Sequence, residues 1–371
     1  MRIVPSAAVT LQELRRRSVA QTLFTPRPLA SALRALGFVQ ADPIRAPARA
    51  QDLVLRHRVK GYVAGDLERR YPRLDIQEDF FINYGFVTGS LYALMHPRTE
   101  ATVPADGGRP WTRSRRTQAA RVMDLFRTTQ ELHPREVEER FSQGTVANYW
   151  GGRSNATTHL LDAMLYHGLI RVSRRESGVR VYAAQPPQQE PTTPAERDAR
   201  LDALADAALG LYAPLPASSL SFLLRKLRHA VPQWQSHLGA VIARARGRLQ
   251  HARVEGVDWW WPERRIPEEP DDAVRLLAPF DPVVWDRARF ELLWGWTYRF
   301  EAYTQPSRRK LGYYALPLLW RDKVIGWGNL TVQNGRLTPE LGYINGAPKD
   351  RGFKRELDLE ISRIEEFLRG G

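Results

Sequence analysis

Cysteine is absent from this chain of 371 residues, and so is any long apolar run. Without cysteine the chain can form no disulfide, thiolate nucleophile, cysteine-based zinc site or iron–sulfur cluster. Without a run of about eighteen apolar residues, no membrane-spanning helix is expected. The N-terminus lacks the basic and then apolar pattern of a secretory signal. We therefore expect a cytoplasmic protein, and we expect neither a metal nor a cofactor.

Lysine is scarce: only six of the 55 basic residues are lysine, so arginine carries most of the positive charge. An arginine-rich genome would produce the same preference for arginine over lysine. It would not produce the excess of basic over acidic residues, which gives a net charge of +14 and a pI of about 10.2. This excess predicts a polyanionic partner, and double-stranded DNA is the first candidate.

The first predicted domain, residues 1–103, begins with two helices and a short strand. Thr10 is a plausible N-cap for a helix that ends near Ala20, because Glu13 completes a capping box. A second helix runs from about Pro28 to Gly37, and a strand follows. Length alone allows about two to four domains in the whole chain.

Gln40 and Asp42 follow the second helix and are two residues apart. On a strand this spacing would point both side chains to the same side, where they would offer an amide and a carboxylate to a ligand. In the alternative interpretation, Asp42 only starts a turn before Pro43 and Gln40 is an exposed strand residue. The spacing by itself leaves both interpretations open.

A basic segment comes directly after this pair. Its cationic side chains are Arg45, Arg49, Arg56, Arg58 and Lys60. They predict either contacts with DNA phosphates or a solvated basic helix. His57, in the same segment, is expected to be packed or to touch phosphate rather than to act as a catalytic base.

The clearest fold signal lies in the second predicted domain, residues 111–184, which follows a Pro- and Gly-rich linker at residues 104–110. Three helices are predicted at Gln118–Phe126, Pro134–Phe141 and Asn155–His167, followed by two strands within Arg171–Tyr182. This order is typical of a winged helix. Arg174, Arg175 and Arg180 lie on the predicted wing and suit phosphate. Because many winged helices only pair proteins together, the DNA interpretation also depends on the net charge.

The third predicted domain, residues 194–268, repeats the pattern of helices and a strand pair. The fourth, residues 273–371, is mostly β. Its strands are predicted at Tyr298–Tyr303, Tyr313–Trp320, Lys323–Thr331 and Arg336–Ile344, with an Asn334–Gly335 hairpin turn and a closing helix at Glu356–Leu368. The expected fold class is α+β: three tandem winged-helix domains followed by a small β-barrel-like domain. A basic loop, Arg308, Arg309 and Lys310, is expected to touch phosphates.

Three segments of the last domain, which follow Gln40 and Asp42 in the chain, together resemble a known protein family. They are Leu276–Asp281 (Leu-Leu-Ala-Pro-Phe-Asp), Glu301–Tyr303 (Glu-Ala-Tyr) and Arg309–Pro317 (Arg-Lys-Leu-Gly-Tyr-Tyr-Ala-Leu-Pro). In this order the chain resembles the AlkZ/YcaQ family of bacterial DNA glycosylases over nearly its whole length, with the Gln-x-Asp form of the YcaQ branch. The resemblance implies three winged helices and a β-barrel around duplex DNA. It also implies that Asp42 activates water with Gln40 as its companion. The chain departs from the family at Phe80–Phe86, where an aromatic–Trp-Ala-His-Ala run is often found.

The implied chemistry is hydrolysis of an N-glycosidic bond through a cationic, oxocarbenium-like sugar, which a nearby carboxylate stabilises. An N7-alkylated purine is already cationic and leaves without a protonating acid. We therefore expect a monofunctional DNA glycosylase for alkylated bases, including interstrand crosslinks, that is monomeric and associated with the nucleoid. The alternative is a non-catalytic winged-helix DNA-binding protein, either a regulator or an architectural factor. Asp281 is expected to be structural.

Overall fold

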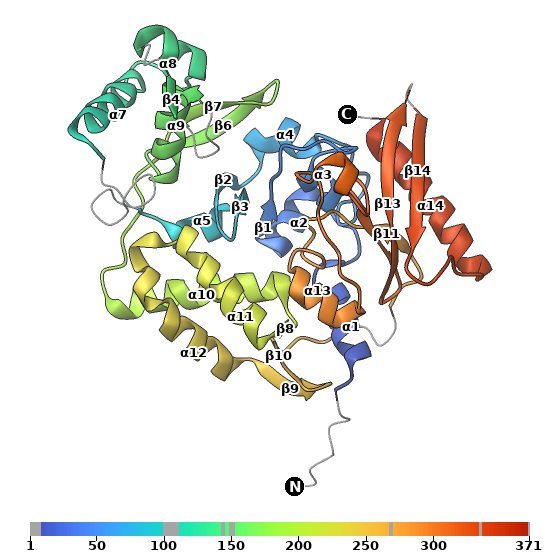
Figure 1. Ribbon diagram of the computed structural model, residues 1–371. Coiled ribbons are helices and arrows are strands. Elements are labelled where there is room, and N and C mark those ends of the chain that lie inside the picture. Colours follow the sequence, from blue (N-terminus) through green and yellow to red (C-terminus); the bar gives the residue numbers. More distant parts are fainter. Residues whose placement is uncertain are drawn as a thin grey trace. The chain divides into compact units, whose positions relative to one another are not determined.

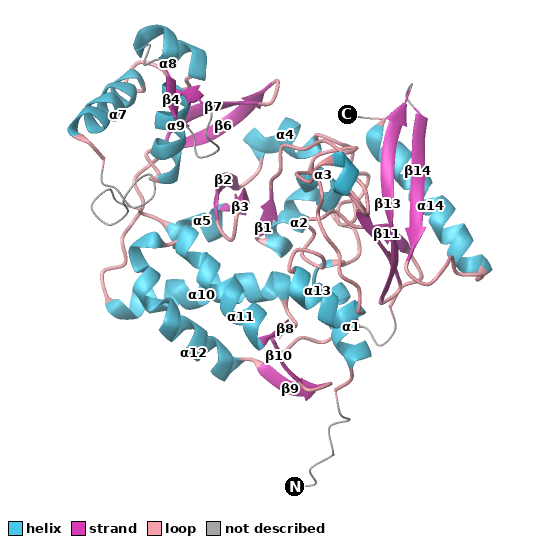
Figure 2. Ribbon diagram, in the orientation of Figure 1, coloured by secondary structure: helices cyan, strands magenta, loops and turns pink. Residues whose placement is uncertain are grey.

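The computed structural model describes residues 9–98, 111–141, 145–147, 153–266, 270–333 and 336–369. Short runs of helices and of strands follow one another along the chain in a mixed α and β fold (Figures 1 and 2). The predicted 104–110 linker and the Asn334–Gly335 turn lie outside the described residues. Contacts group the chain into two compact units. The first comprises residues 1–66, 205–224 and 242–371, and the second comprises residues 67–204 and 225–241. None of the described helices is long and apolar enough to cross a membrane.

The N-terminal segment of the first unit forms as its local signals predict. Its elements are α1 (Leu11–Thr22), α2 (Leu29–Leu36), β1 (Phe38–Gln40) and α3 (Ala50–Leu55), and α4 (Asp66–Arg70) follows at the unit boundary. The Thr10 hydroxyl accepts a hydrogen bond from the backbone N–H of Glu13 at 3.1 Å, which confirms the predicted N-cap. Helix α2 ends at Gly37, whose φ of +71° suits glycine. The chain therefore turns sharply from α2 into the strand that precedes Asp42.

The second unit starts with a β-hairpin and a helix. Its first elements are η1 (Tyr71–Arg73), β2 (Ile76–Phe80), β3 (Tyr84–Thr88) and α5 (Gly89–Met95). Asp79 is buried and bonds both His96, at 2.7 Å, and Arg98, at 2.7 Å. Because a buried carboxylate needs such partners, this cluster ties the hairpin to the segment that follows α5.

The segment from residue 111 to 184 contains the helices and hairpin expected from the sequence. The expected elements are α7 (Arg113–Leu125), which begins before the predicted Gln118, α8 (Pro134–Phe141), α9 (Ala156–Tyr166), β6 (Ile170–Glu176) and β7 (Val179–Ala184). The short strands β4 (Thr145–Ala147) and β5 (Arg153–Asn155) were not predicted. Strands β6 and β7 pair antiparallel around a turn at Ser177 and Gly178, and both of these residues have positive φ. The predicted elements are therefore confirmed, whereas the winged-helix interpretation of the module stays a prediction.

The next segment again combines helices with a strand pair. Its elements are α10 (Pro194–Tyr212), β8 (Leu215–Pro216), α11 (Ala217–Lys226), η2 (Leu227–His229), η3 (Pro232–His237), α12 (Leu238–Arg248), β9 (Gln250–Val254) and β10 (Val257–Trp261). Trp259 and Trp261 alternate on β10 and are buried in a cluster with Leu14 and Leu293. Residues far apart in the sequence thus build one core in the first unit.

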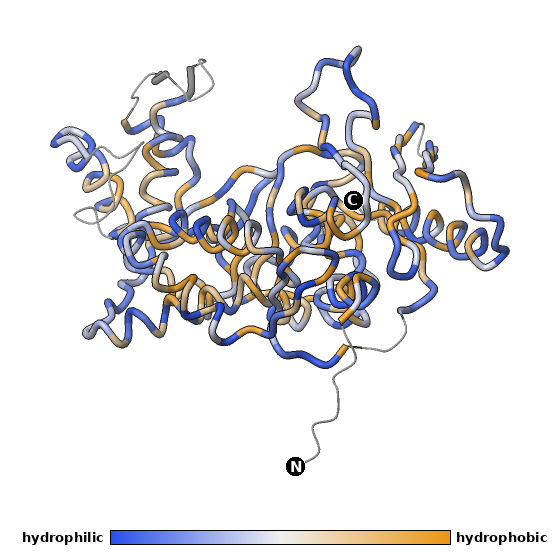
Figure 3. The backbone as a smooth tube through the Cα atoms, turned by 60° about the horizontal axis from the view of Figure 1, so that its bottom comes forward, coloured by the Kyte–Doolittle hydropathy of each residue, from blue (hydrophilic) through white to orange (hydrophobic). Residues whose placement is uncertain are grey.

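The C-terminal segment is an open, curled half-barrel sheet in the order β11-β12-β13-β14, with antiparallel neighbours. Its elements are β11 (Val274–Leu276), α13 (Arg287–Trp294), η4 (Pro306–Arg308), β12 (Leu316–Trp320), β13 (Lys323–Gln333), β14 (Arg336–Tyr343) and α14 (Arg351–Leu368). Helix α14 packs on β11, and its buried apolar residues are Phe353, Ile364 and Phe367. Phe353 contacts the rings of Trp320 and Tyr343, on β12 and β14. Figure 3 shows that hydrophobic and hydrophilic stretches are interspersed along the backbone. The curled half-barrel agrees in part with the predicted β-barrel-like domain, because the sheet of the described strands curls but has the open order β11-β12-β13-β14.

The predicted strand at Tyr298–Tyr303 is wrong. This segment bends and turns instead of pairing, and β11 and α13, which the sequence did not predict, precede it. The turn is held by the Glu301 carboxylate, which accepts hydrogen bonds from the backbone N–H groups of Lys310 and Leu311 at 2.8 and 2.7 Å. A buried acid that bonds a loop backbone therefore overrides the β propensity of the aromatic residues around it.

Candidate active site

Asp42 lies in the loop directly after β1, in the first unit. Its Oδ1 accepts a hydrogen bond from the backbone N–H of Ile44 at 2.9 Å, and its own N–H donates to Gln51 Oε1 at 3.3 Å. Because β1 ends at Gln40, the same-side argument from strand periodicity does not apply to Asp42. The side chain is half-buried. Burial raises the pKa of the Asp42 carboxyl above its usual value, and the hydrogen bond from Ile44 partly offsets this effect.

Gln40 is buried, with 9% of its surface exposed. Its Oε1 accepts a hydrogen bond from the indole N–H of Trp285 at 3.0 Å. The interpretation of Gln40 as an exposed strand residue is therefore wrong. The Trp285 ring lies 4.8 Å from that of Tyr212 and 6.0 Å from that of Phe222, as measured between centroids. Trp285 thus fixes the amide of Gln40 and links it to an aromatic surface, of which the half-exposed Phe222 is the outer member.

The charge of Asp42 affects the pKa values of two tyrosines, Tyr303 and Tyr314. Burial is the larger cause that raises the pKa values of Tyr303 and Tyr314, and repulsion by the Asp42 carboxylate raises both further. The Phe300 ring contacts both tyrosines, with centroid distances of 6.0 Å to Tyr303 and 5.3 Å to Tyr314. Tyr303 is 80% exposed, whereas Tyr314 is 3% exposed. The Asp42 carboxylate therefore acts electrostatically on one tyrosine that is exposed to solvent and on one that is buried.

The sequence analysis missed Trp285 and assigned no role to either tyrosine. Both tyrosines lie in segments that carry the family resemblance. This position was the one sign in the sequence that they could belong to the site. Gly312 shows why the second segment is constrained: its φ is +116°, and a Cβ there would lie 2.4 Å from the amide oxygen of Asn329. The Asn329 amide donates to the carbonyl of Leu311 at 2.7 Å, so β13 holds the loop that leads to Tyr314.

The basic loop reaches solvent beside these tyrosines. Arg308 and Lys310 are exposed. Arg309 is partly buried, donates to the carbonyl of Thr304 at 2.9 Å, and stacks its guanidinium 4.9 Å from the Tyr313 ring centroid. Of the three residues predicted to contact phosphate, Arg308 and Lys310 are thus accessible to a polyanion. Arg309 also stabilises the loop through its bond to Thr304.

Arg58 does not lie on a DNA-facing surface. Its guanidinium is fully buried and forms two hydrogen bonds with the Asp281 carboxylate, at 2.8 and 3.0 Å. It also donates to the carbonyls of Thr22 and Val54, at 2.9 and 2.6 Å. The predicted phosphate contact of Arg58 is therefore wrong, since its donors are occupied in the core. The structural role predicted for Asp281 agrees with its 0% exposure.

Arg56 and His57 are also part of the interior. The Arg56 side chain is 4% exposed, and its guanidinium donates to Glu360 at 2.5 Å and to the carbonyl of Leu276 at 2.9 Å. His57 Nε2 lies 3.0 Å from the same carbonyl, and burial together with nearby arginines lowers the pKa of His57 well below its usual value. The predicted phosphate contact of Arg56 is therefore wrong, and His57 is packed. In contrast, Arg45 and Lys60 are exposed and Arg49 is partly exposed.

The wing arginines of the second unit are engaged with acids. Arg175 forms a bidentate pair with the buried Glu78 at 2.7 and 2.6 Å. Arg180 bonds Asp162 at 2.6 Å. Arg174 pairs with Glu131 and Glu176 but remains 40% exposed. The strand hairpin therefore uses Arg175 and Arg180 for its own packing, and Arg174 is the most accessible of the three.

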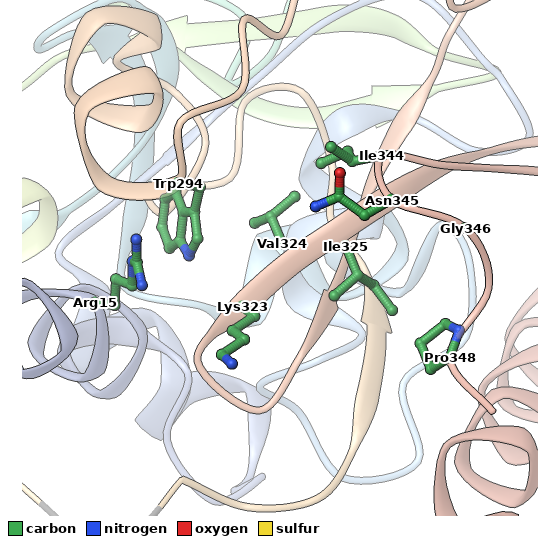
Figure 4. A pocket seen from close by; sticks show the side chains of 9 residues that line it. All are labelled: Arg15, Trp294, Lys323, Val324, Ile325, Ile344, Asn345, Gly346 and Pro348. Atoms are coloured by element: carbon green, nitrogen blue, oxygen red, sulfur yellow. The ribbon is translucent and has the colours of Figure 1, made fainter. Parts of the chain in front are cut away.

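A separate pocket of about 410 Å³ lies in the first unit (Figure 4). Trp294, Val324 and Ile344 give it apolar walls, and Arg15 and Lys323 are its charged members. Its lining includes no acid, so it offers no proton acceptor comparable to Asp42. Within the described ranges, no group of three acidic or histidine side chains is arranged to hold a metal ion.

The chain matches a known family over most of its length. The family model described as DNA glycosylase AlkZ-like matches residues 33–367. The fold is similar to that of the Streptomyces sahachiroi DNA glycosylase AlkZ, with a TM-score of 0.61 and 13% sequence identity over 97% of each chain. The matched region includes Gln40, Asp42, Trp285 and Tyr314. The chain therefore belongs to the AlkZ-like family of DNA glycosylases.

Proposed function

We propose that this protein is a monofunctional DNA glycosylase that removes cationic, alkylated purines from duplex DNA, with water activated by Asp42. The observation that carries this proposal is the half-buried carboxylate of Asp42 in the loop after β1, two residues from Gln40, whose amide is fixed by Trp285. N7-alkylpurines, including those in interstrand crosslinks, are the substrates that fit a site with one carboxylate.

The reaction needs only one proton acceptor. When the C1′–N9 bond breaks, its electron pair neutralises the cationic purine and the sugar becomes an oxocarbenium ion. Water then forms the new C1′–O bond, and its proton passes to Asp42. Because burial raises the pKa of the Asp42 carboxyl, the ionised carboxylate is a stronger base than that of an exposed aspartate.

Binding of duplex DNA is supported by the net charge of +14 and by exposed cations of the first unit. These exposed cations are Arg45, Lys60, Arg308 and Lys310, with Arg49 and Arg309 partly exposed. Arg174 adds a cation on the proposed winged helix of the second unit. Side chains of this kind fix the position of DNA without reading its sequence.

A non-catalytic DNA-binding role is the second candidate. The hydrogen bonds that Asp42 makes with Ile44 and Gln51 favour it, because they are the bonds of a turn-forming aspartate. In that case Asp42 would contribute to the loop after β1 and not to chemistry.

Release of free base separates the two candidates. The purified chain is incubated with a duplex that carries 7-methylguanine, and the released base is quantified by chromatography. A monofunctional glycosylase releases the base and leaves strands that break only after alkali. A duplex that contains uracil serves as the control, because uracil is neutral and should not leave. DNA binding without base release would favour the non-catalytic role.

A further inference from the structure

Two aromatic side chains are exposed to solvent in one short loop of the first unit, residues 301–314. Tyr303 is 80% exposed and Tyr313 is 44% exposed. Among the large hydrophobic side chains of the described residues, none is more exposed than Tyr303. Large exposed rings that gather in one place are typical of an interaction surface.

The backbone of this loop is held by its own side chains. The Glu301 carboxylate accepts hydrogen bonds from the backbone N–H groups of Lys310 and Leu311, at 2.8 and 2.7 Å. Arg309 donates to the carbonyl of Thr304 at 2.9 Å, across the helical turn η4. The two sides of the loop are therefore joined before any partner binds, and little loop entropy is lost on binding.

Both exposed rings have a neighbour that positions them. The Tyr303 ring contacts that of Phe300, with a centroid distance of 6.0 Å and an interplanar angle of 76°. The Arg309 guanidinium lies over the Tyr313 ring, 4.9 Å from its centroid. The same guanidinium binds the carbonyl of Thr304, the residue after Tyr303. Arg309 thus connects the segment that carries Tyr303 with the ring of Tyr313.

The exposed charge of the loop is positive. Arg308 and Lys310 are exposed and Arg309 is partly exposed. Glu301 is the one acid in the sequence from 301 to 314, and it is buried, with 6% of its surface exposed. Proteins bind single-stranded nucleic acid with this combination, because bases stack on the rings while phosphates meet the cations.

We propose that loop 301–314 binds unpaired nucleotides of DNA, whose bases stack on Tyr303 and Tyr313 while Arg308 and Lys310 contact the adjacent phosphates. The bases of an intact duplex are covered on both faces by their neighbours, so only an unpaired base offers a face to these rings. The loop therefore distinguishes DNA with unpaired bases from fully paired DNA. This inference goes beyond the proposed glycosylase function and does not depend on base release.

Equilibrium binding of the purified chain tests the proposal. Two duplexes of equal length and charge are compared by fluorescence anisotropy, one fully paired and one with about four consecutive T·T mismatches that leave bases unpaired. The parent should bind the mismatched duplex at least about fivefold more tightly, as expected for one base stacked on an aromatic ring. Replacing both rings, Tyr303→Ala with Tyr313→Ala, should bring the ratio of the two affinities to about one and leave the affinity for paired DNA within about twofold.

Three control variants separate the rings from the charges. Tyr303→Phe with Tyr313→Phe keeps both rings and should keep the parental ratio. Arg308→Ala with Lys310→Ala should weaken binding to both duplexes by the same factor, because phosphates are present in both. Leu359→Ala removes a side chain that is 45% exposed on α14, and it should change neither affinity.

A parental ratio of about one would overturn the proposal, because the loop would then meet only the backbone of the duplex. An unchanged ratio after replacement of both tyrosines by alanine, or an equal loss of affinity for both duplexes, would also overturn it. Tyr303→Ala alone guards against unfolding of the double variant, since a ring that is 80% exposed contributes little to the core. Its ratio should fall at least about twofold, and an unchanged ratio would contradict a role of this ring. Base release is not measured here, so failure of this inference and failure of the proposed function are distinguishable.

Discussion

The buried pair of Arg58 and Asp281 provides a sharp stability prediction. Both side chains are 0% exposed, and the guanidinium and the carboxylate form two hydrogen bonds, at 2.8 and 3.0 Å. Asp281→Asn keeps the shape of the side chain but removes the charge that compensates Arg58. Breaking a buried pair in this way costs about 3–5 kcal/mol, because the remaining charge stays in the interior.

The measurement is thermal unfolding followed by circular dichroism. For a unit of this size the loss corresponds to a fall in the midpoint of about 6–20 °C. Asp272→Asn is the control, because Asp272 is 64% exposed and pairs with Arg321, which is 46% exposed, at 2.7 Å. Loss of such a surface pair should change stability by less than about 1 kcal/mol. Equal midpoints for the two variants would refute the reasoning.

Three further predictions concern DNA and the site. Neutralising Arg308, Arg309 and Lys310 together should weaken binding equally on every duplex, and the slope of log affinity against log salt should become shallower by about 0.9 per lost phosphate contact. A changed sequence preference in binding titrations would instead show that the loop reads bases. Because burial raises the pKa of Asp42, base release should fall with acid from a midpoint above the usual value of 3.8, and a rate profile with its midpoint at or below that value would contradict this. Tyr303→Leu should lower the preference for 7-methylguanine DNA over undamaged DNA severalfold, as expected for a lost cation–π contact, whereas Tyr303→Phe should not; equal losses in competition binding would contradict a role of the ring.

Local signals in the sequence were reliable. The Thr10 cap and the Gly37 helix stop are determined by neighbouring residues, so the predicted start of α1 and end of α2 agree with the structure. The same holds for the hairpin of β6 and β7 around Ser177 and Gly178. Each of these features depends on backbone geometry within a few positions of the chain.

Features that depend on distant partners could not be predicted. Arg58 and Asp281 are 223 positions apart, and nothing near Arg58 distinguishes it from an exposed arginine. Gln40 and Trp285 are 245 positions apart, so the burial of Gln40 had no local sign. The turn held by Glu301 was likewise hidden, because its aromatic residues have the composition of a strand.

Asp42→Asn with single-turnover release of 7-methylguanine from duplex DNA tests the central claim most directly. Asparagine preserves the acceptor for the Ile44 N–H but cannot take a proton from water, so the rate should fall about 100-fold or more, with folding and DNA affinity retained. Asp358→Asn, at an exposed position on α14, should retain the parental rate. Base release by Asp42→Asn at the parental rate would contradict the assignment of Asp42 as the base.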